Sequence, residues 1–123
     1  MSEPKAYNCP VEATMDVLGG KWKPIVLWWL GQGPLRFSAI RQRVPGVSEK
    51  VLTTSLRELE RDGVVHREVH ASVPPKVVYS LTSVGAELGD AMRALCAWGT
   101  GHMERIGAVR IEPTHAEDLG SDA

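Results

Sequence analysis

Four polar or cationic residues recur at a helical spacing in the middle of this 123-residue chain. They are Lys50, Thr54, Arg57 and Arg61, at positions i, i+4, i+7 and i+11. A helix would carry all four on one outward face, with Thr53 at its edge. Lys and Arg side chains can donate to guanine N7 and O6, and a Thr methyl can touch thymine. This pattern favours a face that reads base edges in a DNA major groove, and the alternative is an ordinary solvated helix face.

Cations and hydroxyls on either side of this stripe are suited to contacts with the DNA backbone. Arg36 and Ser38 begin the preceding predicted helix, where amides, a hydroxyl and a cation could hold phosphate. Arg61, three turns into its helix, is expected to meet a phosphate or an acid such as Glu58 rather than a base. The complete set of candidate DNA-binding residues is Arg36, Ser38, Ser48, Lys50, Thr53, Thr54, Arg57, Arg61, Arg67 and Lys76.

Cys9 immediately precedes Pro10, at the expected start of a helix. The N-terminal amides of a helix stabilise a thiolate and so make a thiol more reactive. This position favours a redox-sensing thiol, and the alternative is a small buried thiol. Cys96 follows the apolar Leu95 and is interpreted as packing. A bond between the two cysteines of different subunits would need a Cα spacing that sequence does not supply.

Other reactive residue types do not form a recognisable site. His66 and His70 would share a strand face, but four residues place them about 13 Å apart, too far to chelate one ion. No Ser/His/Asp order, Gly-rich phosphate loop or pair of catalytic carboxylates stands out, so we expect no enzyme, no metal and no cofactor. The four Trp residues are interpreted as core, the alternative being an aromatic effector pocket lined by Trp22, Trp28, Trp29 or Trp98.

The elements that would position these residues form a winged helix-turn-helix. A short helix over 36–44 is followed by a Pro45-Gly46 turn, and Ser48 caps a second helix that ends at Asp62-Gly63. Leu52, Leu56 and Leu59 give that helix a core face. Two alternating runs, 64–70 and 77–81, are expected to pair across 71–75 as a β-wing that carries Arg67 and Lys76. These charges could enter the minor groove or touch phosphate, or remain solvated strand charges.

Helices on either side of this module are expected to form a dimer. An amphipathic helix is predicted over 11–18, a helix buried from several sides over 22–31, and a long helix over 83–106. The apolar stripe of the long helix outlasts what so small a core could cover, which favours burial against a second copy. The candidate dimerisation residues are Val11, Met15, Leu18, Leu88, Met92, Leu95 and Trp98. The predicted class is therefore mainly α with a small β-wing (α+β).

Composition and charge agree with one small DNA-binding domain. Hydrophobic residues make up 43% of the chain and charged residues 24%, and the net charge is -1. Residues 20–80 nevertheless hold ten Lys and Arg against five acids, a local balance of +5 that would attract phosphate. We expect a flexible N-terminus over 1–8, a domain over 9–106 and a disordered acidic tail over 107–123. No charged leader or apolar stretch of roughly 18 residues is present, which predicts a cytoplasmic protein with free thiols.

Several motifs, in order along the chain, resemble the HxlR family of bacterial winged helix-turn-helix transcription regulators, which are MarR-like. They are Cys9-Pro10, GGKWKPIVLWWL from Gly19, RFSAIRQRVPGVSEKVLTTSLRELERDG from Arg36, VPPKVVYSLTSVG from Val73, and Trp98. The resemblance covers about residues 9–106. It implies a homodimer on a palindromic operator, often as a repressor, with some members responding to oxidants, quinones or aldehydes at the position of Cys9. Gly99 and Gly101 depart from the family pattern and would soften the last helix.

Together these observations predict a sequence-specific DNA-binding regulator, expected to repress transcription as a homodimer on an inverted-repeat operator. Its signal would act through Cys9 by changing the spacing of the two reading helices. Two alternatives stay open: a regulator that responds to a reversible small ligand without thiol chemistry, and a winged-helix module for protein contacts.

Overall fold

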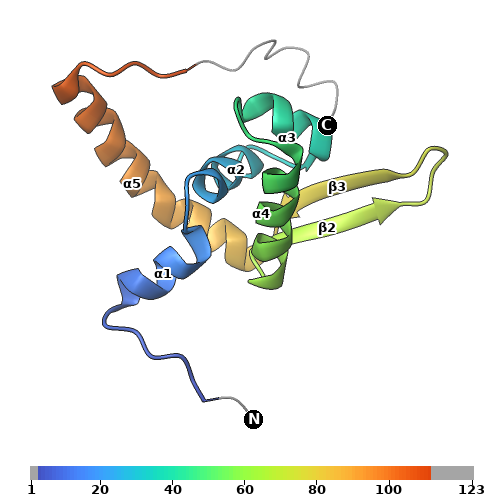
Figure 1. The fold of residues 1–123 in the computed structure, drawn as a ribbon, viewed down its shortest axis with the longest axis horizontal. Coiled ribbons are helices and arrows are strands. Elements are labelled where there is room, and N and C mark those ends of the chain that lie inside the picture. The colour runs from blue at the N-terminus through green and yellow to red at the C-terminus, as the bar shows by residue number, and fades with distance from the viewer. Residues whose placement is uncertain (1–2, 112–123) are drawn as a thin grey trace.

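The computed structural model describes residues 3–111 and contains five helices and a small three-stranded sheet in that part of the chain (Figure 1). The helices are α1 (Pro10–Leu18), α2 (Trp22–Leu30), α3 (Phe37–Arg43), α4 (Glu49–Arg61) and α5 (Ser83–Ile106), and the strands are β1 (Leu35–Arg36), β2 (Val65–His70) and β3 (Lys76–Leu81). The predicted α+β class is confirmed. The predicted acidic tail lies outside the described residues from 112 onward.

Helices α2, α3 and α4 form the helix-turn-helix and its support. The apolar stripe of α4 packs inward as its spacing predicts, and Leu52, Leu56 and Leu59 are almost completely buried. Ser48 caps α4, because its Oγ accepts a hydrogen bond from the Val51 amide at 3.1 Å. Gly63 follows the helix with φ of +79°, a conformation that glycine adopts without strain.

The wing is an antiparallel sheet in the order β1-β3-β2. Strands β2 and β3 pair from Val65 opposite Leu81 to His70 opposite Lys76, as predicted. The two-residue strand β1 was not predicted: Arg36 pairs with Val78 instead of opening α3. Figure 1 shows the β2–β3 hairpin extending away from the helices. Val65 is therefore buried at its base, whereas Val69, near the tip, is exposed.

Helix α5 is anchored tightly at its start. The Thr82 hydroxyl donates to the Gly63 carbonyl at 2.6 Å and accepts from the Gly85 amide at 3.0 Å. A Cβ on Gly85 would lie 2.0 Å from the Val64 carbonyl oxygen, so only glycine fits this contact. The helix then runs without interruption through Gly99 and Gly101 to Ile106. Its C-terminal half projects past the body of the molecule (Figure 1).

The core lies between α2, α3, α4 and the base of the wing, and it takes in two residues that the sequence assigned to dimerisation. Leu18 is 4% exposed and Met92 is 7% exposed, both within the core of this chain. Leu88 is partly buried against the same core. These residues lie where α1 and α5 contact the rest of the chain. The apolar periodicity alone could not distinguish them from the exposed apolar residues of the same two helices. Among residues 3–111, no helix is long and apolar enough to cross a membrane.

Candidate DNA-binding surface

Helix α4 presents the predicted polar stripe to solvent. Lys50, Thr54, Arg57 and Arg61 are exposed. Thr53 is half-buried at the edge of the stripe, toward the wing. The opposite side of the helix is fixed by its three buried leucines, so the stripe cannot rotate inward without exposing the core. The cations and hydroxyls of the stripe are thus held on a rigid convex element.

The wing and α4 enclose a hollow that adds further donors. Its lining residues are Thr53, Arg57, Glu60, Arg67 and Tyr79. Arg67 stands opposite Tyr79 in the β2–β3 ladder, which turns it to the same side of the sheet as the hollow. The sequence reasoning did not identify Tyr79 or Glu60 as members of this surface. Tyr79 lies opposite Arg67 in the predicted β2–β3 hairpin, so the register of that hairpin was the signal that could have placed it on this surface.

Most cations of this surface form no ion pair within the described part of the chain, and Arg61, next to Asp62, is the exception. Within residues 3–111, no carboxylate comes within ion-pair distance of Arg36, Lys50, Arg57, Arg67 or Lys76. The cations that do have such partners are Lys5, Lys23, Arg41, Arg61 and Arg93. These unpaired cations are available to pair with the phosphates of a polyanion.

The predicted backbone-contacting residues lie at the start of α3 and α4. Ser38 is exposed in the first turn of α3, and Arg36, half-buried in β1, is the residue immediately before that helix. Ser48 is exposed, and although its Oγ accepts the Val51 amide hydrogen bond, its O–H can still donate to a phosphate oxygen. Lys76 stands at the first position of β3, toward the tip of the wing.

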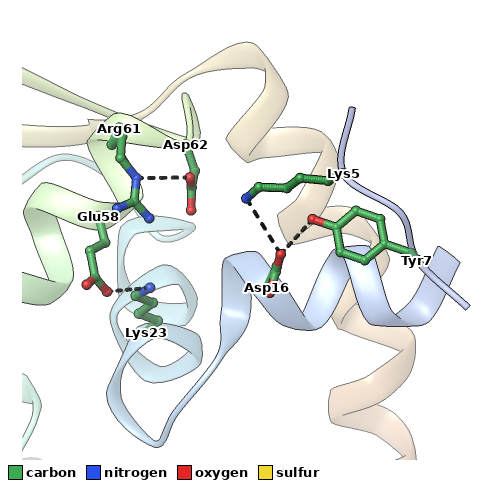
Figure 2. Close-up of polar contacts among 7 residues, drawn as sticks. All are labelled: Lys5, Tyr7, Asp16, Lys23, Glu58, Arg61 and Asp62. Atoms are coloured by element: carbon green, nitrogen blue, oxygen red, sulfur yellow. Dashed lines mark hydrogen bonds and ion pairs between the residues drawn. The ribbon is translucent and has the colours of Figure 1, made fainter. Parts of the chain in front are cut away.

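Glu58 of α4 and Asp62, which follows α4, each lie close to a cation (Figure 2). Arg61 was expected to meet a phosphate or an acid such as Glu58, and the acid beside it is Asp62, whose Oδ1 lies 3.5 Å from Arg61 Nε. Glu58 Oε1 lies 2.6 Å from Nζ of Lys23 instead. The hydrogen bond and the charge of Lys23 hold the pKa of Glu58 below its usual value, so this carboxylate is ionised at neutral pH.

Cys9 is exposed at the N-cap of α1, and its side chain makes no capping hydrogen bond. The alternative of a small buried thiol is therefore wrong. The segment before it lies along α1: the Tyr7 hydroxyl donates to Asp16 Oδ2 at 2.6 Å, and the Asn8 amide donates to Glu12 Oε1 at 3.0 Å. The hydrogen bond to Asp16 raises the pKa of Tyr7. Cys96 is half-buried on α5.

Apolar side chains remain uncovered on α1 and on the projecting part of α5. Val11 and Met15 are exposed on α1, and Leu95 and Trp98 are 62% and 64% exposed on α5. Trp98 is therefore not a core residue. Its ring stacks on His102 with centroids 5.0 Å apart. The other three Trp residues are half-buried, and Trp28 lines a small cavity between α2, α5 and the base of β3.

The histidines of the wing bind a carboxylate of the same strand. His70 Nε2 lies 2.9 Å from Glu68 Oε1, and His66 Nε2 lies 3.7 Å from Glu68 Oε2. In the described part of the chain, no three His, Cys, Asp or Glu side chains are grouped so that they could hold a metal ion.

Comparison with known proteins places this geometry among characterised folds. A protein family described as HxlR-like helix-turn-helix matches residues 17–107. The chain is 47% identical over 104 residues to the uncharacterized HTH-type transcriptional regulator YtcD of Bacillus subtilis, covering 85% of this chain and 82% of that protein. The redox regulator HypR in its oxidized form is similar at a TM-score of 0.72 and 48% identity, covering 76% of this chain and 96% of that one. Diamide-treated YodB from B. subtilis is similar at a TM-score of 0.66 and 35% identity, over 76% of this chain and 93% of that one.

Proposed function

This chain belongs to the HxlR-like helix-turn-helix family of DNA-binding transcriptional regulators, which are not enzymes, and from that premise we propose how it binds its operator. Two copies place their α4 helices about 34 Å apart in successive major grooves of an inverted repeat. Occupying a promoter in this way represses transcription. Because its proposed target is DNA, we infer that the chain acts in the cytoplasm.

The unpaired cations of α4 and the wing are the observation that carries this proposal. Lys50, Thr54 and Arg57 are exposed along α4 and would reach base edges from a helix that fits the groove. Arg67 and Lys76 would meet the sugar-phosphate backbone on either side of the wing, while Arg36 and Ser38 would hold phosphate at α3. The remaining predicted positions, Ser48, Thr53 and Arg61, border these contacts.

A second copy of the chain would cover the exposed apolar residues of α1 and α5. Val11 and Met15 on α1 and Leu95 and Trp98 on α5 lie outside the core of one chain. Removing this area from water by pairing two copies would stabilise the assembly. The same contact would fix the distance between the two α4 helices, and therefore which operator spacing is read.

Cys9 is the proposed point at which oxidants act. Its thiol is exposed at the start of α1, one of the two helices assigned to the dimer contact. The names of two relatives support this role, since HypR is described as a redox regulator and YodB was solved after diamide treatment. Oxidation at this position would move one subunit against the other and misalign both half-sites.

A titration of labelled DNA tests both parts of the proposal. Duplexes from upstream of its own and the adjacent gene are titrated with the protein against scrambled competitor, before and after diamide. Specific binding that diamide abolishes and dithiothreitol restores supports a thiol-switched regulator, provided that Cys9→Ser removes the diamide effect. The same titration with Cys96→Ser is the matched control, and an intersubunit Cys9–Cys96 bond predicts loss of the effect there too.

A regulator that responds to a non-covalent ligand predicts different results. Binding would then be specific yet indifferent to diamide, and Cys9→Ser would still respond to the natural inducer. A winged-helix protein-contact module predicts no preference among these duplexes at all.

A further inference from the structure

An ion pair between a buried lysine and a partly exposed glutamate joins α4 to the centre of the fold. Lys23 lies in the first turn of α2, and its side chain is only 10% exposed. Its Nζ is 2.6 Å from Oε1 of Glu58 on α4, and Figure 2 shows the two side chains pointing toward each other. Because a buried ammonium group is costly without a partner, this contact determines where the Glu58 carboxylate points.

Glu58 stands at the border of the candidate DNA-binding stripe. It follows Thr54 by four residues, which places it about 40° further around the helix axis. Its side chain is 39% exposed, so it has access to solvent on that border. A carboxylate free to turn outward here would bring a negative charge next to Thr54 and Arg57, where DNA phosphates must approach.

We propose that Lys23 is a positioning residue for DNA binding, which draws the Glu58 carboxylate toward α2 and neutralises its charge so that α4 presents its cations to phosphate. Lys23 itself touches no DNA. The inference rests on the proposed function, and it assigns a binding role to a residue that lies inside the protein. At neutral pH the role is needed, because Glu58 is then ionised whether or not it is paired.

Lys23→Met tests the inference, since Met keeps an apolar stem of similar length and removes the ammonium group. We expect affinity for cognate and scrambled duplexes to fall by about three- to tenfold at low salt, the effect of one unpaired carboxylate a few ångströms from phosphate. In Lys23→Met/Glu58→Gln the liberated charge is gone, and affinity should return to the wild-type value. Lys23→Arg, which keeps a cation for Glu58, should also bind like the wild type.

The matched control is Arg93→Met, which removes one cation from the exposed Asp90–Arg93 pair on α5. It changes the net charge by the same amount as Lys23→Met, so it shows whether total charge alone matters. We expect it to bind DNA like the wild type. Urea midpoints confirm that each variant is folded, and if Lys23→Met is unfolded, Lys23→Gln takes its place in the same comparison.

Salt separates this role from a purely structural one. The loss in Lys23→Met should shrink as salt is raised, because a charge effect at the surface is screened, whereas a misplaced helix would remain misplaced. A loss that persists at high salt, or that Glu58→Gln does not repair, overturns the inference. If the wild type binds and Lys23→Met binds equally well, only this inference fails. If the wild type binds no DNA, the proposed function fails and the inference fails with it.

Discussion

At the scale of single residues, we propose that cations on α4 read bases and that cations on the wing hold the sugar-phosphate backbone. Arg57 lies on the exposed stripe of α4, and Lys76 lies at the first position of β3 in the wing. For Arg57→Ala we predict a loss of about 1 to 3 kcal/mol on the cognate duplex with little change on scrambled DNA, because a base contact is lost. Lys76→Ala should weaken both duplexes alike. Fluorescence anisotropy measures these affinities. If both variants lost the same amount of preference for the cognate over the scrambled duplex, the proposed division between base contacts and backbone contacts would be contradicted.

Gly85 illustrates a residue whose small size is a packing requirement. A methyl group there would meet the Val64 carbonyl oxygen at 2.0 Å, and neither backbone segment can move freely because Thr82 bonds both of them. We predict that Gly85→Ala lowers the free energy of unfolding by about 1 to 3 kcal/mol or more, the cost of overpacking. The control is Gly99→Ala on the same helix.

Gly99 lies in open space on α5, because a methyl group added there would meet no heavy atom of a neighbouring element within 4 Å. Gly99→Ala should raise stability by up to about 1 kcal/mol through helix propensity. Urea denaturation of both variants checks the pair. Similar changes in the free energy of unfolding for Gly85→Ala and Gly99→Ala would show that the close approach at Gly85 does not determine stability.

At the scale of elements, the hydrophobic periodicity and the capping and turn residues were sufficient to predict most of the helices and strands. The leucine spacing of α4 and the Ser48 cap predicted that helix almost to the residue, and the length of α5 was predicted at both ends. Strand β1 was not predicted, because a segment of two residues is too short to show the alternation of apolar and polar residues that indicates a strand. Leu18 and Met92 were assigned to the dimer contact because both belong to an apolar stripe. Such a stripe shows which face of a helix is apolar, but it does not show whether the core of the same chain or a second copy covers that face.

The ion pair between α2 and α4 could not be predicted, because nothing in sequence spacing links positions 23 and 58. We expect it to make the stability of the helix-turn-helix sensitive to acid. The pKa of Glu58 lies below its usual value in the folded chain, mainly because of the hydrogen bond from Lys23. Stability from the pair is therefore fully present above the unfolded value and is lost as pH falls through the folded value.

We predict that acidification from about pH 6 to about pH 3 lowers the urea midpoint of the wild type more than that of Lys23→Met/Glu58→Gln, which lacks the titrating pair. The difference should open as the pH falls below the usual pKa of a glutamate. Parallel loss of stability in the two proteins over that interval would show that the pair does not stabilise the fold.

At the scale of the whole molecule, the proposed operator complex depends on two copies meeting through the exposed residues of α1 and α5. Leu95→Glu/Trp98→Glu places two charges on the projecting half of α5, where both side chains are more than half exposed. Burying these charges between two copies would be costly, so we predict a folded monomer by sedimentation, with a large loss of affinity for an inverted repeat. Val73→Glu, another exposed apolar position at the wing tip, should remain a dimer. A dimeric double variant would place the contact elsewhere.

The identities of the operator and the inducer also depend on the whole assembly, and neither could be predicted from the sequence or from the structure of one chain. Base preference depends on how three or four side chains of α4 meet a particular groove, and that geometry is set by the dimer and the DNA together. What one chain determines is the chemistry of the surface. Exposed cations without an ion-pair partner lie on α4 and the wing, and α1 and α5 both carry exposed apolar side chains.

Operator binding by two copies is tested most directly by a stoichiometric anisotropy titration of the upstream duplex and a scrambled duplex of equal length, repeated over a range of salt. We predict tighter binding to the upstream duplex, saturation at two chains per site, and an affinity that falls steeply with salt as phosphate contacts release counterions. Equal affinity for the two duplexes, or saturation at one chain per site, would contradict sequence-specific binding by a dimer.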